Sequence, residues 1–309
     1  MELRHVRYFL AVAEERNFTR AAAKVGIGQP PLSQQIRSLE HELGAPLFLR
    51  FSHGAELTEA GRAFLPEARA LLAQAERAAC TARRGARGQV GRLRVGYTGS
   101  AIFCLTVPAA LRAFRRKYPG VELSLEEAPT ASLLERLHSQ HLDGAFIRPG
   151  RVDPAGVRVH ALDEEPFVAV LPSNHLAAKA SSLPLCELAA ETFVLFARQA
   201  GPSLFDELLV ACRQAGFEPI LGQEAPQLAS IAHLVAAGLG VSLVPRSVSA
   251  VQVEGVKYLP IQGDAPTARL ALATTLDAHS IVVQQFVALT QAVANQPISK
   301  QIARRNLPS

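Results

Sequence analysis

Apolar residues in the first part of the chain recur every three or four positions, which is the spacing of one helical face. This pattern predicts a first helix over residues 2–16, a second helix that ends at Gly26, and a third with Ile36 and Leu39 as apolar positions. Two short helices joined by a tight, glycine-containing turn form a helix-turn-helix, whose second helix lies in the major groove of DNA. The pattern by itself also fits an ordinary helical hairpin with a solvated polar face.

The next segment predicts a small wing and a long helix. Residues 45–61 indicate two short strands around the turn Ser52-His53-Gly54. Thr58 is expected to cap a long helix, with Pro66 bending it or marking a break. One face of this helix carries a stripe of small and medium apolar residues: Leu65, Ala68, Leu72, Ala75 and Ala79. A long helix with a single apolar stripe needs a partner, and a second copy of itself is the obvious candidate.

From Arg92 onward the pattern changes to alternating strands and helices. Strands are predicted at RLRVGYT, VELSLEEA and DGAFIR, then at PFVAVLP, FVLFA, PILGQEA and VSLVP, and finally at RLALATT. Strands that alternate with helices favour right-handed crossovers and parallel sheets. We therefore expect an α+β multidomain chain with two α/β lobes, joined by two crossing strands around a cleft. Open α/β sheets bind ligands at the carboxyl ends of their strands.

Length and charge agree with this division. A chain of 309 residues, 49% of them hydrophobic, has room for two or three domains with their own cores. Residues 1–90 contain 13 Lys and Arg against 9 Asp and Glu, whereas the rest contains 19 against 18. Nearly all the excess positive charge therefore lies in the segment expected to bind DNA, where phosphates would be neutralised.

Several functional classes lack their sequence signals. The start MELRHVRYFL is too charged for a signal peptide, and no apolar stretch approaches a membrane span, so we expect a cytoplasmic protein. No nucleophile, P-loop, dinucleotide or metal motif is found, so we expect no catalysis, cofactor or metal. His138 and His141 are interpreted as surface residues. The four cysteines are most simply small buried apolar residues, and a redox switch stays open as an alternative: Cys80, Cys104, Cys186 and Cys212.

At this point the chain resembles the LysR-type transcriptional regulators. The segment FLAVAEERNFTRAAAKVGIGQPPLSQQIRSLEHELGAPLFLR and the following LTEAG carry the most specific match, and FRRKYPGVEL, PSNH and HLVAAGLGVSLVP extend it over essentially the whole chain. The resemblance implies a winged helix-turn-helix over 1–58, a linker and dimerisation helix with a hinge over 59–90, and a periplasmic-binding-protein-like effector domain over 91–296. Within that domain, lobe I would cover about 91–162 and 267–296 and lobe II about 163–266, followed by a flexible tail, 297–309.

The resemblance also implies partners. A homotetramer, built as a dimer of dimers, would bind an interrupted inverted repeat in double-stranded DNA, engage RNA polymerase and activate more often than repress. The effector domain is most similar to the branch that senses benzoate, cis,cis-muconate and chloroaromatic acids, which implies a small carboxylate effector. The wing departs from the family pattern because it is poor in Arg and Lys and contains Glu56. Asp163 stands where some aromatic-acid sensors have an Arg, so a second effector site is not expected.

Residues of the helix-turn-helix are candidates for DNA contacts. Short polar side chains on the third helix can reach base edges and phosphates, while Pro30 and Pro31 offer apolar contact to thymine methyls. Asn17 or Thr19 should cap the second helix and direct backbone donors at a phosphate. The candidate DNA-binding residues are Thr19, Gln29, Pro30, Pro31, Ser33, Gln34, Arg37, Arg50 and His53. The alternative for Arg37 is a surface salt bridge with Glu40 or His41.

A second set of candidates converges on the expected cleft. Each polar member follows a strand or opens a helix, where hydroxyls, N–H groups and a helix N-terminus favour an anion. Arg148 suits a carboxylate, and the resemblance places the matching Ser, Thr and Arg at the effector carboxylate. The candidate effector-binding residues are Gly99, Ser100, Ile102, Phe103, Thr130, Arg148, Pro202, Leu204 and Phe205. In the alternatives, Ser100 and Thr130 only cap helices, and Arg148 pairs with Glu126 or Asp143.

Two further functions stay open. A regulator of the same family could sense another metabolite, such as an amino-acid derivative, or an oxidant through Cys104. A cytoplasmic solute-binding or catalytic α/β protein with an incidental helical N-terminus is the alternative from another class.

Overall fold

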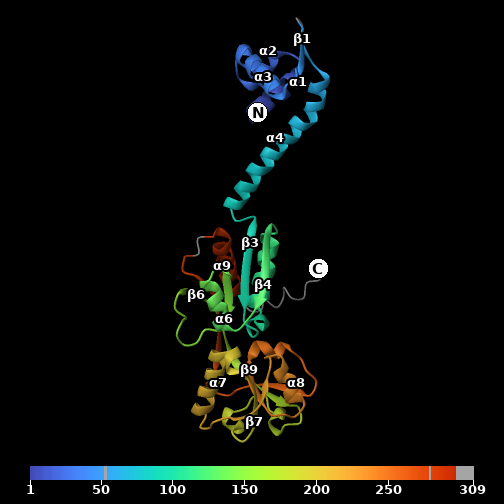
Figure 1. Ribbon diagram of the computed structural model, residues 1–309. Helices are drawn as coiled ribbons and strands as arrows, with labels where there is room; N and C mark the ends of the chain where they lie inside the picture. Colours follow the sequence, from blue (N-terminus) through green and yellow to red (C-terminus); the bar gives the residue numbers. More distant parts are fainter. Residues whose placement is uncertain (52–53, 278–279, 297–309) are drawn as a thin grey trace. The chain divides into compact units, whose positions relative to one another are not determined.

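The computed structural model describes residues 1–51, 54–277 and 280–296 (Figure 1). It divides into two compact units, Met1–Gly85 and Ala86–Ser309. The expected wing residue His53 and the expected tail 297–309 lie outside the described residues. Within the described part, no helix is long and apolar enough to cross a membrane.

The N-terminal unit contains a helix-turn-helix followed by a hairpin and a long helix. Asn17 caps the second helix, since its Oδ1 accepts hydrogen bonds from the backbone N–H groups of Thr19 (2.9 Å) and Arg20 (3.1 Å). The turn needs Gly26, whose φ of +73° is left-handed. The elements are α1 (Leu3–Glu15), α2 (Phe18–Val25), α3 (Gln29–Leu43), β1 (Phe48–Phe51), β2 (Gly54–Leu57) and α4 (Glu59–Ala86).

The expected capping of the long helix is confirmed, and of the two effects expected for Pro66, a bend or a break, the break does not occur. The Thr58 hydroxyl accepts a hydrogen bond from the N–H of Gly61 at 2.9 Å, which starts α4. The helix then runs unbroken through Pro66 to Ala86. Aromatic rings hold its first turns to the core, because Phe64 packs edge-on against Phe9 with 5.0 Å between centroids.

The second unit is built on a seven-stranded sheet in the order β10-β6-β11-β5-β3-β4, with β9 also pairing with β6. The expected parallel crossovers are confirmed, because β3 pairs in parallel with both β4 and β5. Two long antiparallel strands, β6 and β11, pass from one lobe to the other (Figure 1). The elements of lobe I are β3 (Gly91–Tyr97), α5 (Thr106–Lys117), β4 (Val121–Glu127), α6 (Thr130–His138), β5 (Gly144–Ile147), β11 (Thr267–Thr275) and α9 (Ile281–Ala294).

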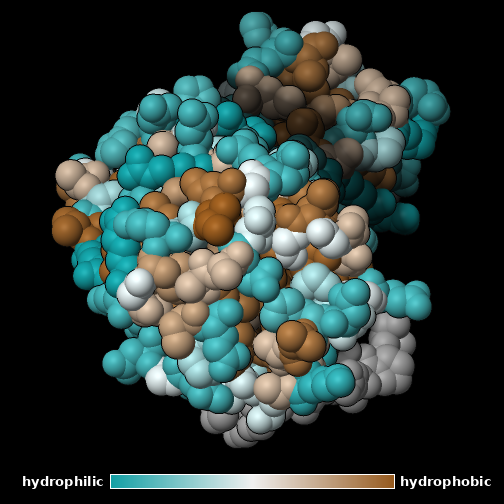
Figure 2. Space-filling model, turned by 90° about the horizontal axis from the view of Figure 1, so that it is seen from below, coloured by the Kyte–Doolittle hydropathy of each residue, from teal (hydrophilic) through white to brown (hydrophobic). Residues whose placement is uncertain are grey.

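Lobe II contains the far end of β6 and a second, two-stranded parallel sheet, β7-β8. β6 spans Val157–Pro172, and the other elements of lobe II are β7 (Thr192–Phe196), α7 (Pro202–Gln214), β8 (Ile220–Ala225), α8 (Ser230–Ala236), β9 (Ser242–Pro245), η5 (Arg246–Ala250) and β10 (Val256–Pro260). Short 3₁₀ helices complete the unit: η1 (Ala101–Phe103), η2 (Leu176–Lys179), η3 (Leu185–Leu188) and η4 (Arg198–Ala200). Seen from below, the surface is largely hydrophilic, with apolar residues in separate patches (Figure 2).

Each lobe has its own apolar core. In lobe I, Phe286 of α9 packs edge-on against Phe114 of α5 and Phe146 of β5, with centroids 5.2 and 5.9 Å apart. Lobe II buries a separate cluster that includes Phe167 and Phe193. Because both cores are continuous with β6 or β11, the two crossing strands set the geometry of the cleft between the lobes.

Candidate nucleic-acid interface and ligand pocket

The third helix presents several of the expected DNA contacts to solvent. Gln29, Pro30, Pro31, Gln34 and Arg37 are all exposed, while Leu32, Ile36 and Leu39 face the core. The two prolines occupy the first turn of α3, where a missing N–H leaves no helical hydrogen bond unmade. The described residues give Arg37 no ion pair with Glu40 or His41. This side chain is therefore available to a phosphate or a base.

Two other expected contacts are bonded to each other. Ser33 is buried, and its hydroxyl accepts a hydrogen bond from Nη1 of Arg50 at 2.5 Å. The Arg50 guanidinium also lies 4.5 Å from the ring centroid of Phe18 and 3.6 Å from a carboxylate oxygen of Glu40. Thr19 is exposed at the start of α2, but Asn17 supplies the cap.

A cavity of about 580 Å³ lies between the two lobes of the second unit. Lobe I contributes the segments that follow β3 and β4 and the end of β5. Lobe II contributes α7 and the segment before α8. The lining residues are Thr98, Gly99, Ser100, Ile102, Phe103, Glu127, Ala128, Pro129, Thr130, Arg148, Phe196, Ala200, Gly201, Ser203, Leu204, Pro226, Gln227, Leu228 and Ala229.

Seven of the nine expected effector residues line this cavity, and Pro202 and Phe205 do not. Phe205 is turned toward the lobe II core, where its ring lies edge-on to Phe196 at 6.2 Å. The sequence did not single out Thr98 or Glu127. Both stand at the carboxyl end of a parallel strand, so the rule that selected Gly99 could have found them.

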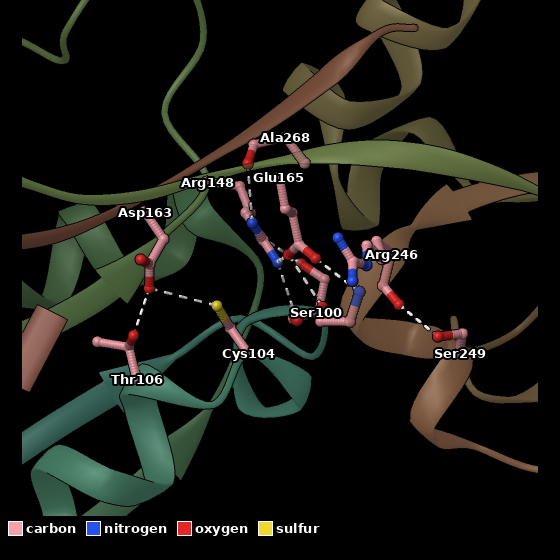
Figure 3. A network of polar contacts seen from close by, with 10 residues as sticks. Ser100, Cys104, Thr106, Arg148, Asp163, Glu165, Arg246, Ser249 and Ala268 are labelled. Carbon is pink, nitrogen blue, oxygen red and sulfur yellow. Dashed lines mark hydrogen bonds and ion pairs between the residues drawn. The ribbon is translucent and has the colours of Figure 1, made fainter. Parts of the chain in front are cut away.

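Arg148 is the most heavily bonded side chain of the cavity wall (Figure 3). It is 3% exposed, and its Nη2 donates to Oε1 of Glu165 at 2.6 Å. Its Nε donates to the Ser100 hydroxyl at 3.3 Å, and its Nη1 donates to the carbonyl of Ala268 at 3.2 Å. The guanidinium is thus held by lobe I and by both crossing strands.

Neither alternative partner of Arg148 is used. Glu126 forms an ion pair with Arg136 instead, and Asp143 pairs with Arg94 at 2.9 Å. The sequence did not indicate Glu165 as a partner of Arg148. The two residues are 17 positions apart, and only the folding of the chain brings them together.

Glu165 also bonds to lobe II. Its Oε2 accepts a hydrogen bond from the backbone N–H of Ser247 at 2.6 Å, and its Oε1 accepts one from the Ser247 hydroxyl at 2.9 Å. Ser247 lies in η5, directly after β9. One carboxylate therefore connects the arginine at the cavity wall with an element of the second lobe.

The remaining polar groups of the cavity wall differ in whether they have hydrogen-bond or ion-pair partners. The buried hydroxyl of Thr98 has no hydrogen-bond partner among the described residues. The helix α6 begins at Thr130 without a side-chain cap, so its first N–H groups are free to bind an anion. Glu127, by contrast, adds a negative charge to the same wall, with no ion-pair partner in the described part of the chain.

Cys104 lies beside this network rather than on the cavity wall. Its thiol donates a weak hydrogen bond to Oδ2 of Asp163 at 3.6 Å, and Thr106 donates to the same carboxylate oxygen. Burial, and after it the negative charges of Glu165 and Asp163, raise the pKa of Cys104 to about 12. Among the described residues, no group of three or more His, Cys, Asp and Glu could hold a metal ion.

Comparison with known proteins agrees with this architecture. Residues 3–62 match the family model "Bacterial regulatory helix-turn-helix protein, lysR family", and residues 86–295 match "LysR substrate binding domain". The chain belongs to the LysR family of transcriptional regulators. Like the rest of that family, this LysR-family protein is a DNA-binding regulator and not an enzyme.

Relatives support the assignment over nearly the whole length. The "Uncharacterized HTH-type transcriptional regulator YnfL" of Escherichia coli (strain K12) is 41% identical over 261 residues, 84% of this chain and 88% of its own. BudR of Raoultella terrigena is 38% identical, over 93% of this chain and 99% of its own. The crystal structure of full-length CbnR complexed with its target DNA superposes with a TM-score of 0.85, at 30% identity over 96% of this chain and all of that one.

Proposed function

We propose that this regulator activates transcription in response to a small carboxylate, aromatic or diene in character, bound in the cavity between its lobes. We also propose that it acts in the cytoplasm as a homotetramer, a dimer of dimers, on an interrupted inverted repeat of double-stranded DNA, and that it engages RNA polymerase there. The solved complex of CbnR with target DNA supports the DNA partner. The tetramer, the polymerase contact and activation rest on family resemblance.

On the DNA side, the exposed face of α3 would enter the major groove. Gln29, Gln34 and Arg37 would then bond to base edges or phosphates, and Pro30 and Pro31 would touch thymine methyls. The backbone N–H groups at the start of α2, near Thr19, would face a phosphate. The observation that supports this arrangement is that these side chains of α3, and Thr19 at the start of α2, are exposed in the free protein.

On the effector side, the observation that carries the proposal is a buried arginine on the wall of a cavity with apolar surfaces. Arg148 would bind the ligand carboxylate together with Ser100, the free hydroxyl of Thr98 and the uncapped start of α6 at Thr130. A ring or diene would lie against the apolar part of the wall, which is formed by Ile102, Phe103, Phe196, Leu204 and Leu228. A pocket with an apolar body and a few polar anchors is typical of small-molecule sites.

The ligand carboxylate would have to share Arg148 with Glu165. Because Glu165 also holds Ser247 in lobe II, a change in its bond to Arg148 is transmitted to that lobe. An effector that binds one arrangement of the lobes more tightly would shift the population toward it. This is a physical route from the cavity to the relation of the lobes.

One observation favours a second class of ligand. Glu127 brings an unpaired carboxylate to the cavity wall, and Arg148 is already neutralised by Glu165. A ligand that carries an ammonium or hydroxyl donor as well as a carboxylate, such as an amino-acid derivative, would satisfy both groups. Sensing of an oxidant through Cys104 is not supported, because its raised pKa keeps the thiol in the unreactive, protonated form.

A thermal-shift screen tests the proposal. The purified protein is heated with benzoate, substituted benzoates, cis,cis-muconate, amino acids and aliphatic diacids, and a ligand of the folded state raises the melting temperature with its concentration. We expect an aromatic or diene acid to do so, and Ser100→Ala and Arg148→Ala to weaken the shift. Ser249→Ala is the matched control, since within the described part of the chain its half-buried hydroxyl donates only to the carbonyl of Arg246.

Other outcomes would redirect the proposal. Shifts with amino acids alone, lost in Glu127→Gln, would assign the second ligand class. Shifts with aromatic acids that persist unchanged in a folded Arg148→Ala protein would remove Arg148 from the carboxylate site.

A further inference from the structure

Three parts of the DNA-binding unit meet at one arginine. Arg50, on the wing strand β1, donates to the hydroxyl of Ser33 on α3 at 2.5 Å. Its guanidinium lies over the ring of Phe18 at the start of α2, 4.5 Å from the centroid. Its Nη2 is 3.6 Å from Oε2 of Glu40, which is also on α3. One side chain therefore contacts both helices of the helix-turn-helix from the wing.

Glu40 strengthens the same junction through the backbone. Its Oε1 accepts hydrogen bonds from the N–H groups of Leu47 (2.8 Å) and Phe48 (3.1 Å), where the wing begins. The ring of Phe48 packs edge-on against Phe18 at 5.7 Å. With only 15% of its side chain exposed, Glu40 bonds to the wing and is turned away from solvent.

Burial and pairing determine how available Ser33 and Arg50 are to DNA. Ser33 is 9% exposed, and its hydroxyl is turned toward Arg50, from which it accepts a hydrogen bond. The charge of Arg50 is partly offset by Glu40, and one face of its guanidinium is covered by Phe18. Arg50 is itself exposed, with 32% of its side chain accessible, but its paired guanidinium attracts a phosphate less than Arg37, which has no ion pair among the described residues.

We propose that Ser33, Glu40 and Arg50 form a clasp that positions the wing and the start of α2 on the recognition helix α3, and that none of the three contacts DNA itself. This replaces the sequence-based expectation that Ser33 and Arg50 touch DNA. The clasp acts through its neighbours: it holds the exposed face of α3, the N-terminus of α2 and the wing in one fixed geometry, which the DNA then meets as a preformed surface.

The salt dependence of DNA binding separates a clasp from a contact. Each phosphate contact that is lost reduces the slope of log Kd against log salt concentration by about 0.9. A residue that only positions its neighbours lowers affinity at every salt concentration and leaves the slope nearly unchanged.

The experiment uses the full-length protein and a double-stranded oligonucleotide that the wild-type protein selects from a random library. Binding is followed by fluorescence anisotropy over a series of KCl concentrations, at a temperature where circular dichroism shows each variant to be folded. Arg50→Ala should weaken binding roughly tenfold, which corresponds to the loss of a charge-assisted hydrogen bond, with the wild-type slope. Arg37→Ala serves as the contact reference, with a slope reduced by about 0.9.

A double-mutant cycle gives a second, independent readout. If Ser33 acts only through Arg50, the Ser33→Ala/Arg50→Ala double variant binds no more weakly than Arg50→Ala alone. Ser38→Ala, on the exposed face of the same helix, is the matched control for the serine substitution. Glu40→Gln should also weaken DNA binding, and the Glu40→Gln/Arg50→Ala double variant should bind no more weakly than Arg50→Ala alone. Glu42→Gln, which changes a carboxylate paired only with the N-terminal amine in the described residues, should not.

Any one of three results would overturn the clasp. A slope reduced by about 0.9 in Arg50→Ala would make Arg50 a phosphate contact. Fully additive losses for Ser33→Ala and Arg50→Ala, or a Ser33→Ala protein whose base preference changes at one operator position, would make Ser33 a DNA contact. If Arg50→Ala does not fold, the Ser33→Ala and Glu40→Gln proteins answer the question, because each removes a single bond from the clasp.

Discussion

Glu165→Gln should destabilise the effector domain strongly, although it exchanges one side chain for another of equal size. The substitution removes the negative charge 2.6 Å from Nη2 of Arg148, a side chain that is only 3% exposed. Removing one partner of a buried ion pair costs about 3–5 kcal/mol, because the other charge stays buried without compensation. The bonds of Arg148 to Ser100 and Ala268 remain, so the lower end of that range, about 3 kcal/mol, applies here.

The assay is thermal unfolding of the purified protein. For a domain of this size, a change of about 3 kcal/mol lowers the melting temperature by roughly 6–12 °C. Glu164→Gln is the matched control on the same strand, since Glu164 is exposed and accepts a hydrogen bond from the Thr267 hydroxyl. A surface change of this kind alters stability by about 0.5 kcal/mol or less.

The same variant also reports on ligand binding. With Glu165 neutral, Arg148 carries an uncompensated charge, so an added carboxylate should bind at least tenfold more tightly and restore part of the lost stability. If Glu165→Gln melts within 2 °C (about 1 kcal/mol) of Glu164→Gln, the reasoning fails, because the buried ion pair would then contribute nothing to the fold.

Cys104 should react with iodoacetamide far more slowly than the exposed Cys80 and Cys186, because a pKa of about 12 leaves roughly one thiol in ten thousand ionised at pH 8; equal rates by mass spectrometry would contradict its burial. Asn17→Ala should lower the unfolding free energy of the DNA-binding unit by about 1 kcal/mol, measured by urea denaturation, because two N–H groups lose their cap. Burial lowers the pKa of His160, so the unfolded chain takes up its proton first as the pH falls. Stability should therefore be complete above about pH 6.5 and decline below it, and His160→Gln should reduce that decline.

The helix-turn-helix could be predicted because its signals are local. Gly26 at the turn, the cap at Asn17 and the prolines at the start of α3 each act within one helical turn, so their effect does not depend on distant residues. The strands β3, β4 and β5 were predictable for the same reason, since each is a short apolar run between turns. The first half of β6 was missed, because Asp163, Glu164 and Glu165 interrupt its apolar pattern.

The ligand cavity was predicted only in part. The rule that sites form at the carboxyl ends of parallel strands selected Gly99, Ser100, Thr130 and Arg148, all of which line it. That rule uses strand order, which the sequence suggests. The rule does not say which face of α7, on the other lobe, points into the cavity. It therefore did not exclude Phe205, which packs against Phe196 instead.

The sequence by itself determined the family, most of the helices and strands, and the segment that carries the excess positive charge, because these depend on short-range patterns. It did not reveal the first half of β6 or the strand β10. Only the tertiary structure decided which polar side chains are free and which are paired. Ser33 meets Arg50 across 17 positions, and Glu165 meets Ser247 across 82. Such pairs form when folding brings distant strands and helices together, and a buried charge must find its partner there because water no longer reaches it.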